Sequence, residues 1–101
     1  MAKITNMTSS NGNKVANQFI IREDEDSMSG NAVEYFQSYN SVIAKRDKFK
    51  AGETYRKVWL DSTYWNYSKT TAKYRNMFLG ETTKETQAKI DNGTYKLVNL
   101  N

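Results

Sequence analysis

Residues 64–80 have the sequence YWNYSKTTAKYRNMFLG and carry the signals that begin and end a helix. Ser68 or Thr70 supplies a side-chain oxygen that accepts a hydrogen bond from the free amides of a first turn. Gly80 suits the left-handed backbone conformation that commonly follows a last turn. We therefore predict a helix over residues 68–80, and the rest of the chain is organised around it.

The pattern inside this helix separates an apolar face from a basic one. Tyr74, Met77 and Phe78 recur at the three- and four-residue spacing of a packed helix face. The other directions are taken by polar and positively charged side chains, namely Lys69, Lys73, Arg75 and Asn76. One face is expected to pack on the core and the other to be basic and exposed.

A second short helix and a strand are expected after Gly80. Thr82 and Glu85 have the spacing of a capping box, in which each side chain binds a free amide of the other's turn. Glu85 and Lys89 form an i,i+4 pair in the favourable order, and Gly93 provides the stop. Residues 95–100 alternate in the manner of a final strand.

Extended segments precede the central helix. Alternation predicts strands over residues 14–22, 32–39 and 41–46, the last two joined by a tight turn at 40–41, and a buried strand over 58–60. Residues 1–13 form either a flexible leader or a short edge strand that ends in a turn at 11–12.

These elements predict one fold. We expect a single α+β domain over residues 1–101, with a single antiparallel sheet of about four to five strands and two short helices packed on one face. The expected core consists of large apolar side chains from both layers, namely Phe19, Val33, Trp59, Tyr74 and Phe78.

Composition excludes several classes of function. The 101 residues contain neither cysteine nor histidine, which removes thiolate zinc sites, thiol nucleophiles and most general-base chemistry. We therefore expect no enzyme, metal or cofactor. No apolar run approaches the roughly 20 residues of a membrane helix. A cytoplasmic protein, without a membrane partner, is the expectation.

Four adjacent carboxylates, at residues 23–26, resemble a cation site. The spacing of a calcium loop fails, because Met28 stands where an oxygen ligand belongs and no Glu occupies the closing position. A solvated acidic loop is the simpler interpretation. Pairing of this loop with a basic segment of another copy or of a partner is the alternative.

Positive charge is concentrated in the middle of the chain. Of the net charge of +4, all of the surplus lies between residues 45 and 75, and residues 45–57 are expected to form a basic connecting loop around Gly52. Such an asymmetry favours an acidic partner, whether a nucleic acid, a ribonucleoprotein or an acidic protein surface.

Aromatic residues are interleaved with these cations, as in surfaces that stack bases and neutralise phosphates. Packing alone explains Trp59, Tyr67, Tyr74 and Phe78, and exposed aromatics beside Arg also describe a protein interface. The candidate binding residues are the cations and loop aromatics Lys45, Arg46, Lys48, Phe49, Lys50, Tyr55, Arg56, Lys57, Tyr64, Lys69, Lys73 and Arg75.

Three segments are distinctive: residues 35–44, residues 65–81 with the motif Tyr-Ser-x-Thr-Thr-x-Lys-Tyr-Arg-Asn-x-Phe-Leu-Gly-Glu at 67–81, and residues 84–86. Together they resemble a family of small uncharacterised proteins from phages and mobile elements of Gram-positive bacteria. The resemblance covers residues 35–101 and carries over no catalytic residue. It implies a phage setting, in which small cysteine-free proteins often inhibit host defences such as CRISPR.

Two functional hypotheses follow. The first is a phage-encoded, anti-CRISPR-like inhibitor that binds a host defence protein or ribonucleoprotein, such as a Cas effector, stoichiometrically in the host cytoplasm. The alternative is an accessory or regulatory protein that binds DNA or RNA directly. DNA mimicry is disfavoured, because it requires an acidic surface and the middle of this chain is basic.

Overall fold

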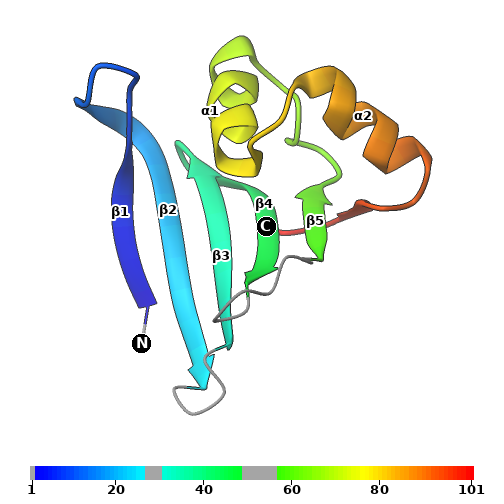
Figure 1. Ribbon diagram of the computed structural model, residues 1–101, viewed down its shortest axis with the longest axis horizontal. Helices are drawn as coiled ribbons and strands as arrows, with labels where there is room; N and C mark the ends of the chain where they lie inside the picture. The colour runs from blue at the N-terminus through cyan, green and yellow to red at the C-terminus, as the bar shows by residue number, and fades with distance from the viewer. Residues whose placement is uncertain (1, 27–30, 49–56) are drawn as a thin grey trace.

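The structure, a computed structural model, describes residues 2–26, 31–48 and 57–101, and describes only the backbone of residues 2, 24–26, 31 and 48 (Figure 1). The elements in this part of the chain, in order, are β1 (Ala2–Thr8), β2 (Lys14–Asp26), β3 (Asn31–Ser38), β4 (Ser41–Lys48), β5 (Val58–Asp61), α1 (Lys69–Leu79), α2 (Thr83–Asp91) and β6 (Lys96–Val98).

One six-stranded sheet forms a layer, and its strands follow one another in chain order from β1 to β6 (Figure 1). Neighbouring strands are antiparallel except β5 and β6, which are parallel because α1 and α2 form the crossover between them. The predicted α+β class is confirmed. The sheet is mixed and has more strands than predicted.

The additional strand length comes from residues 1–13, for which an edge strand was one of two alternatives, and from the acidic run that was expected to be a loop. Residues 1–13 contribute β1, which pairs with β2 as the edge strand of the sheet. The prediction that residues 23–26 form a loop is wrong. Their backbone belongs to β2, which continues to Asp26 and pairs with β3 up to Asn31. Ladder hydrogen bonds along β3 thus hold the acidic run extended.

The β3–β4 hairpin is confirmed, with the turn displaced by one residue. β3 ends at Ser38 and β4 begins at Ser41, so Tyr39 and Asn40 form the loop. Tyr39 adopts the left-handed region at φ 55°, which a two-residue hairpin loop demands and which a bulky side chain rarely adopts.

Helix α1 has the predicted boundaries. The Ser68 side chain accepts a hydrogen bond from the Thr71 amide, and Gly80 follows the last turn at φ 70°. Tyr74 and Phe78 are buried as expected, whereas Met77 is 45 % exposed. The packed face of α1 is therefore narrower than the apolar pattern suggested.

Helix α2 begins with the predicted capping box, in which Thr82 and Glu85 satisfy each other's amides. The expected partner of Lys89 is different, because its ammonium lies 2.6 Å from a carboxylate oxygen of buried Glu81. The hydroxyl of Tyr95 donates to the same oxygen at 2.8 Å. The hydrogen bond with Glu81 raises the pKa of Lys89, and this cluster holds α2 against the α1–α2 turn.

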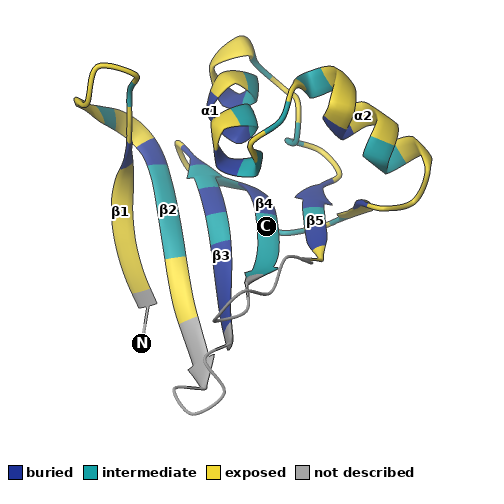
Figure 2. Cartoon of the chain, viewed as in Figure 1, coloured by how far each residue is buried: buried dark blue, intermediate teal, exposed yellow. Residues whose placement is uncertain are grey.

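The core lies between α1 and one face of the sheet, as the dark blue segments of Figure 2 show. Phe78 stacks on Phe36 of β3 with ring centroids 5.9 Å apart. The cluster is completed by buried side chains from the strands, from α1 and from the segment after α2, namely Met7, Ile43, Ala44, Val58, Leu60, Tyr74 and Tyr95.

Three of the five predicted core residues face the other way. Phe19, Val33 and Trp59 lie on the sheet face opposite α1, where Val33 is buried and the two aromatics are half-buried. In β2 the reason is a left-handed residue, Asn17 at φ 64°, which interrupts the alternation. Val15 and Ile20 therefore both pack on the core.

Asp61 joins the end of β5 to the segments around it. Its side chain is 1 % exposed, and its carboxylate accepts hydrogen bonds from the amides of Thr63, Tyr64 and Leu100 at 2.8–3.0 Å. Burial alone would raise the pKa of Asp61, but these amides and Asn101 hold the pKa below its ordinary value.

An Asp61→Asn variant tests this role. The variant is expected to lose about 1–3 kcal/mol of unfolding free energy at neutral pH, because one acceptor oxygen becomes a donor facing amide donors. The folded pKa is lowered, so the carboxylate stabilises the fold above the unfolded pKa of about 4 and loses this effect as pH falls through the folded pKa. Urea unfolding at several pH values should show that the difference in unfolding free energy between parent and variant shrinks toward acid pH. A difference that stays constant with pH would contradict this role of the Asp61 carboxylate.

Candidate binding surface

The sheet face opposite α1 and α2, called here the helix-free face, carries one continuous cross-strand row. Each residue of the row is the register partner of the next, from β1 to β6, and the row consists of Ile4, Ile21, Tyr35, Lys45, Trp59 and Lys96. Tyr35 precedes the core residue Phe36 and Trp59 precedes the core residue Leu60, so alternation directs both rings away from the helices.

Lys45 links the two aromatic rings of this row. Its ammonium lies 5.0 Å from the centroid of Trp59 and 5.8 Å from that of Tyr35. Both distances are within the range of a cation–π interaction, which is worth about 0.5–1 kcal/mol at an exposed site. The centre of the helix-free face is therefore a strip in which a cation lies between two rings.

Charge is divided across the helix-free face. Lys57 immediately precedes β5, two residues before Trp59, and with Lys96 it adds exposed cations to the β5–β6 side. Glu23 and Asp47 flank Val33 in the next row of this face. An approaching anion is accordingly attracted to the β4–β6 half of the sheet.

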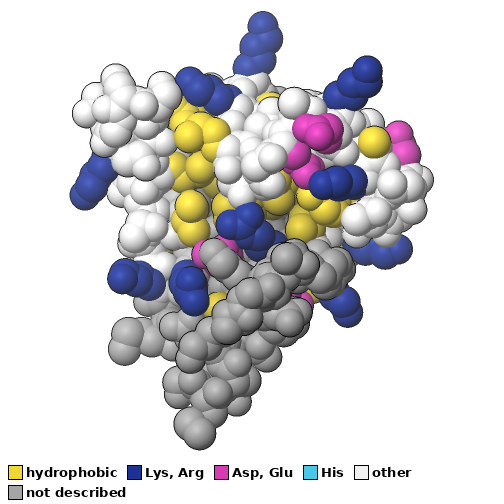
Figure 3. Space-filling model, viewed as in Figure 1, with side chains coloured by type: hydrophobic (Ala, Val, Ile, Leu, Met, Phe, Trp, Pro, Cys, Tyr) yellow, Lys and Arg dark blue, Asp and Glu magenta, His cyan; other side chains and the backbone are white. Residues whose placement is uncertain are grey.

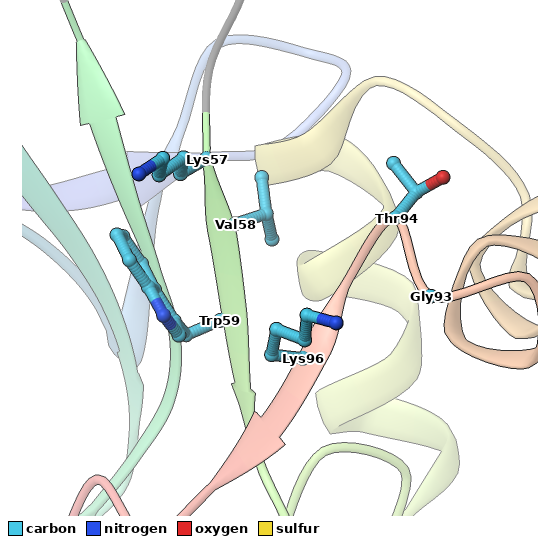
Figure 4. Close-up of a pocket in the computed structure, with 6 residues that line it drawn as sticks. All are labelled: Lys57, Val58, Trp59, Gly93, Thr94 and Lys96. Atoms are coloured by element: carbon cyan, nitrogen blue, oxygen red, sulfur yellow. The ribbon is translucent and has the colours of Figure 1, made fainter.

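An open pocket of about 440 Å³ adjoins the β5–β6 end of the row (Figure 4). It is lined by Lys57, Val58, Trp59, Gly93, Thr94 and Lys96. In Figure 4 the Lys57 and Trp59 side chains project toward β4, whereas those of Val58 and Lys96 project toward the turn after α2. The pocket therefore widens the basic end of the helix-free face.

The sequence-based candidates are distributed over several parts of the molecule. Lys45 and Lys57 lie on the helix-free face, and Lys69 and Lys73 are exposed on α1. Phe49, Lys50, Tyr55 and Arg56 lie outside the described residues, as does the side chain of Lys48. The structure thus brings Lys45 and Lys57 together with Trp59, and separates them from the lysines of α1.

Arg46, expected on a basic loop, belongs to β4 and points toward the helices. Its guanidinium lies 2.9 Å from a carboxylate oxygen of Glu34 and donates to the Phe78 carbonyl at 2.5 Å. It also lies 4.1 Å from the centroid of the Phe78 ring. These contacts place Arg46 at the interface between the sheet and α1. They occupy most of its N–H donors, which leaves few for a partner.

Arg75, expected on the exposed basic face of α1, is fully buried at 0 % exposure. Its guanidinium stacks 5.0 Å from the centroid of Trp65 and donates to the Trp65 carbonyl at 2.6 Å. Further donations reach Asn66, Asn76 and Thr83 at 2.8–3.1 Å. The exposure predicted for Arg75 is wrong, because these acceptors make its burial possible.

The two tyrosines before α1 exchange the positions expected of them. Tyr64, a predicted contact residue, is half-buried against the core, whereas Tyr67, a predicted packing residue, is 49 % exposed. Their rings meet edge to face with centroids 5.6 Å apart. Tyr67 is thus the more accessible of the pair.

The binding residues predicted from the sequence did not include Tyr35, Lys96 or the two isoleucines of the cross-strand row. Alternation was visible in each strand, but nothing in the sequence stated which side of each strand faces the helices. The signal that could have found the row is the aromatic or apolar residue immediately preceding a buried one, as Tyr35 precedes Phe36.

The helix side of the molecule offers a second hollow. Hydrophobic side chains show beside α1, over β2 and β3, while Lys and Arg side chains are spread around the outline (Figure 3). A groove of about 380 Å³ there is lined by Thr5, Asn6, Met7, Thr8, Ile20, Arg46, Met77 and Phe78. Arg46 already contacts Glu34 and Phe78 within it, so this groove is the less basic of the two.

Neither a metal cluster nor a membrane helix is found in the described part of the chain. Residues 2–26, 31–48 and 57–101 contain no group of three or more His, Cys, Asp or Glu side chains placed to hold a metal ion. None of the helices described is both long and apolar enough to cross a membrane.

Comparison with known proteins gives one match. A family described as "Family of unknown function (DUF8033)" matches residues 2–93, which include β1 to β5 and both helices. No curated protein and no solved structure matches the chain.

Proposed function

The chain belongs to the DUF8033 family of unknown function, and we propose that it is a phage-encoded binding protein that inhibits a host defence ribonucleoprotein stoichiometrically. The inhibitor acts by occupying a surface of its target. The observation that carries this proposal is the strip on the helix-free face, where Lys45 lies between Tyr35 and Trp59.

The composition of this strip supports binding. Interfaces draw much of their energy from tyrosine and tryptophan, which bury large areas at low entropic cost. The sheet holds both rings at fixed positions, so these side chains lose little conformational entropy on association. The cations at the β4–β6 half supply attraction toward an acidic partner.

The chemistry of the described residues supports a role that needs no reaction. The buried side chains of Asp61, Arg75 and Glu81 each make internal hydrogen bonds or ion pairs. The helix-free face presents lysines beside the Trp59 ring and carboxylates at Glu23 and Asp47. Such a surface recognises charge and shape.

Capture of the target from host lysate tests the proposal. We compare the parent with a Lys45→Glu/Lys96→Glu variant, with Lys69→Glu/Lys84→Glu as a control of equal charge change on the helices. The first variant is expected to weaken capture of a ribonucleoprotein at least about tenfold at physiological salt, because like charges facing each other across an interface cost several kcal/mol. The control variant should capture as the parent does.

Nuclease treatment separates the two candidate functions. Nuclease-resistant capture of a defence protein, with loss of host immunity to an incoming plasmid, supports the inhibitor. Capture of nucleic acid alone supports the accessory protein, for which the alternation of cation and aromatic ring in the strip is the favouring observation. Equal capture by both charge-reversed variants would place the interface away from the helix-free face.

A further inference from the structure

The described residues on the helix-free face match one kind of anionic ligand in particular. A carboxylate on a partner protein would use the ammonium groups and leave the ring faces to apolar contacts. A nucleotide uses both, since its phosphate pairs with a lysine while its base stacks on an aromatic ring. Lys45 lies within 5.8 Å of the centroids of both Tyr35 and Trp59, so the two kinds of contact are available side by side.

We infer that this face binds single-stranded nucleic acid, whether the strand is free or held in a ribonucleoprotein. The inference rests on the proposed function for the position of the surface, and it names the chemical class of the partner. Bases stack on Tyr35 and Trp59, Lys45 neutralises the phosphate between them, and Lys96, beyond Trp59 on β6, neutralises the next phosphate.

The row places its two aromatic rings on strands that are not adjacent. Neighbouring strands lie about 4.8 Å apart, so Tyr35 on β3 and Trp59 on β5 are separated by roughly two strand spacings. Sheets that recognise single-stranded RNA likewise place aromatic residues on an open face and stack two or three bases there. Phe19, half-buried on the same face of β2 and paired with Gln37, adds a third ring beside the row.

The distribution of charge on the helix-free face indicates where the nucleic acid lies. Exposed Lys57 and Lys96 are at the β5–β6 side, next to the open pocket of about 440 Å³, whereas Glu23 and Asp47 flank Val33 on the β2–β4 part. A polyanion is therefore drawn toward β4, β5 and β6 and away from the acidic residues. The bases of a duplex are already stacked on one another, so a duplex would use the lysines and leave the rings without a partner.

Fluorescence polarisation with labelled oligonucleotides of about 12 nucleotides tests this inference on the full chain. The probes are oligo(dT), oligo(U) and a blunt duplex of the same length, titrated at several salt concentrations. The parent is expected to bind the single strands at least about tenfold more tightly than the duplex, because stacking contributes only where bases are accessible.

Two substitutions remove one kind of contact each. Trp59→Leu removes a stacking platform and is expected to weaken single-strand binding about 5- to 100-fold with the salt dependence unchanged. Lys45→Gln removes a phosphate contact and is expected to lower the slope of log affinity against log salt by about 0.7. The matched controls are Tyr67→Leu, an exposed tyrosine before α1, and Lys84→Gln on α2. Both should bind as the parent does, and thermal melts establish that each variant is folded.

The outcomes separate this inference from the proposed function. Loss of oligonucleotide binding with Trp59→Leu and Lys45→Gln, but not with the controls, supports single-strand binding. Absence of oligonucleotide binding by a parent that still captures a nuclease-treated protein through Lys45 and Lys96 overturns the inference and leaves the proposed function standing. Binding of duplex and single strand with equal affinity, or equal losses in variants and controls, also overturns it.

Discussion

A Phe78→Ala variant is expected to lose about 3–5 kcal/mol of unfolding free energy, a large part of the stability of a domain of this size. Phe78 is 4 % exposed, stacks on Phe36 and makes a cation–π contact with the guanidinium of Arg46. Removal of its ring leaves a cavity between α1 and the sheet that the surrounding strands fill only in part. Urea denaturation followed by circular dichroism measures the loss.

The neighbouring residue provides the control for this prediction. Met77 is 45 % exposed, and Met77→Ala should change the unfolding free energy by no more than about 0.5 kcal/mol. Similar losses in the two variants would mean that α1 is rotated about its axis relative to the arrangement described.

Arg75→Ala is expected to cost about 3 kcal/mol, although a charged residue on a helix is usually dispensable. Without the guanidinium, the Trp65 carbonyl loses its side-chain donor, and the side chains of Asn76 and Thr83 keep only the hydrogen bonds that they make to each other. Thr83 begins α2, so the junction of the two helices should loosen with the loss of these bonds. Hydrogen exchange of the amides in α1 and α2, together with thermal melting, would report both effects.

Two further variants sharpen the interpretation of Arg75. Arg75→Lys should recover little of the stability, because an ammonium cannot reproduce the planar fork of donors. Lys73→Ala, two residues away and exposed, should leave the melting temperature nearly unchanged. A melting temperature of Arg75→Ala equal to that of the parent would show that water satisfies these acceptors equally well.

The two helices and their ends were predictable from the sequence because helix signals are local. Ser68 and the Thr82–Glu85 capping box bind amides within three residues, and the Gly80 amide donates to the Asn76 carbonyl four residues before it; the structure contains all of these caps. The α+β class followed for a related reason, since two short amphipathic helices require an apolar sheet to cover. Tyr74 and Phe78 were placed in the core by their spacing alone.

The faces of the strands were not predictable, because alternation states that neighbouring side chains point in opposite directions without stating which direction is inward. One left-handed residue, Asn17, shifts the alternation of β2, so Val15 and Phe19 lie on opposite faces. Trp59 appeared to be core because it is large and lies between Val58 and Leu60. The structure places it beside Lys45 on the helix-free face.

The sequence by itself determined the helices, their caps, the fold class and the concentration of positive charge, all of which depend on composition or on residues close together in the chain. Only the tertiary structure decided which cations reach the surface. Arg75 is buried because acceptors from Trp65 to Thr83 converge on it, and Arg46 is half-buried because it points from β4 toward Phe78. The row from Ile4 to Lys96 likewise exists only once six strands are in register, since each strand contributes a single residue.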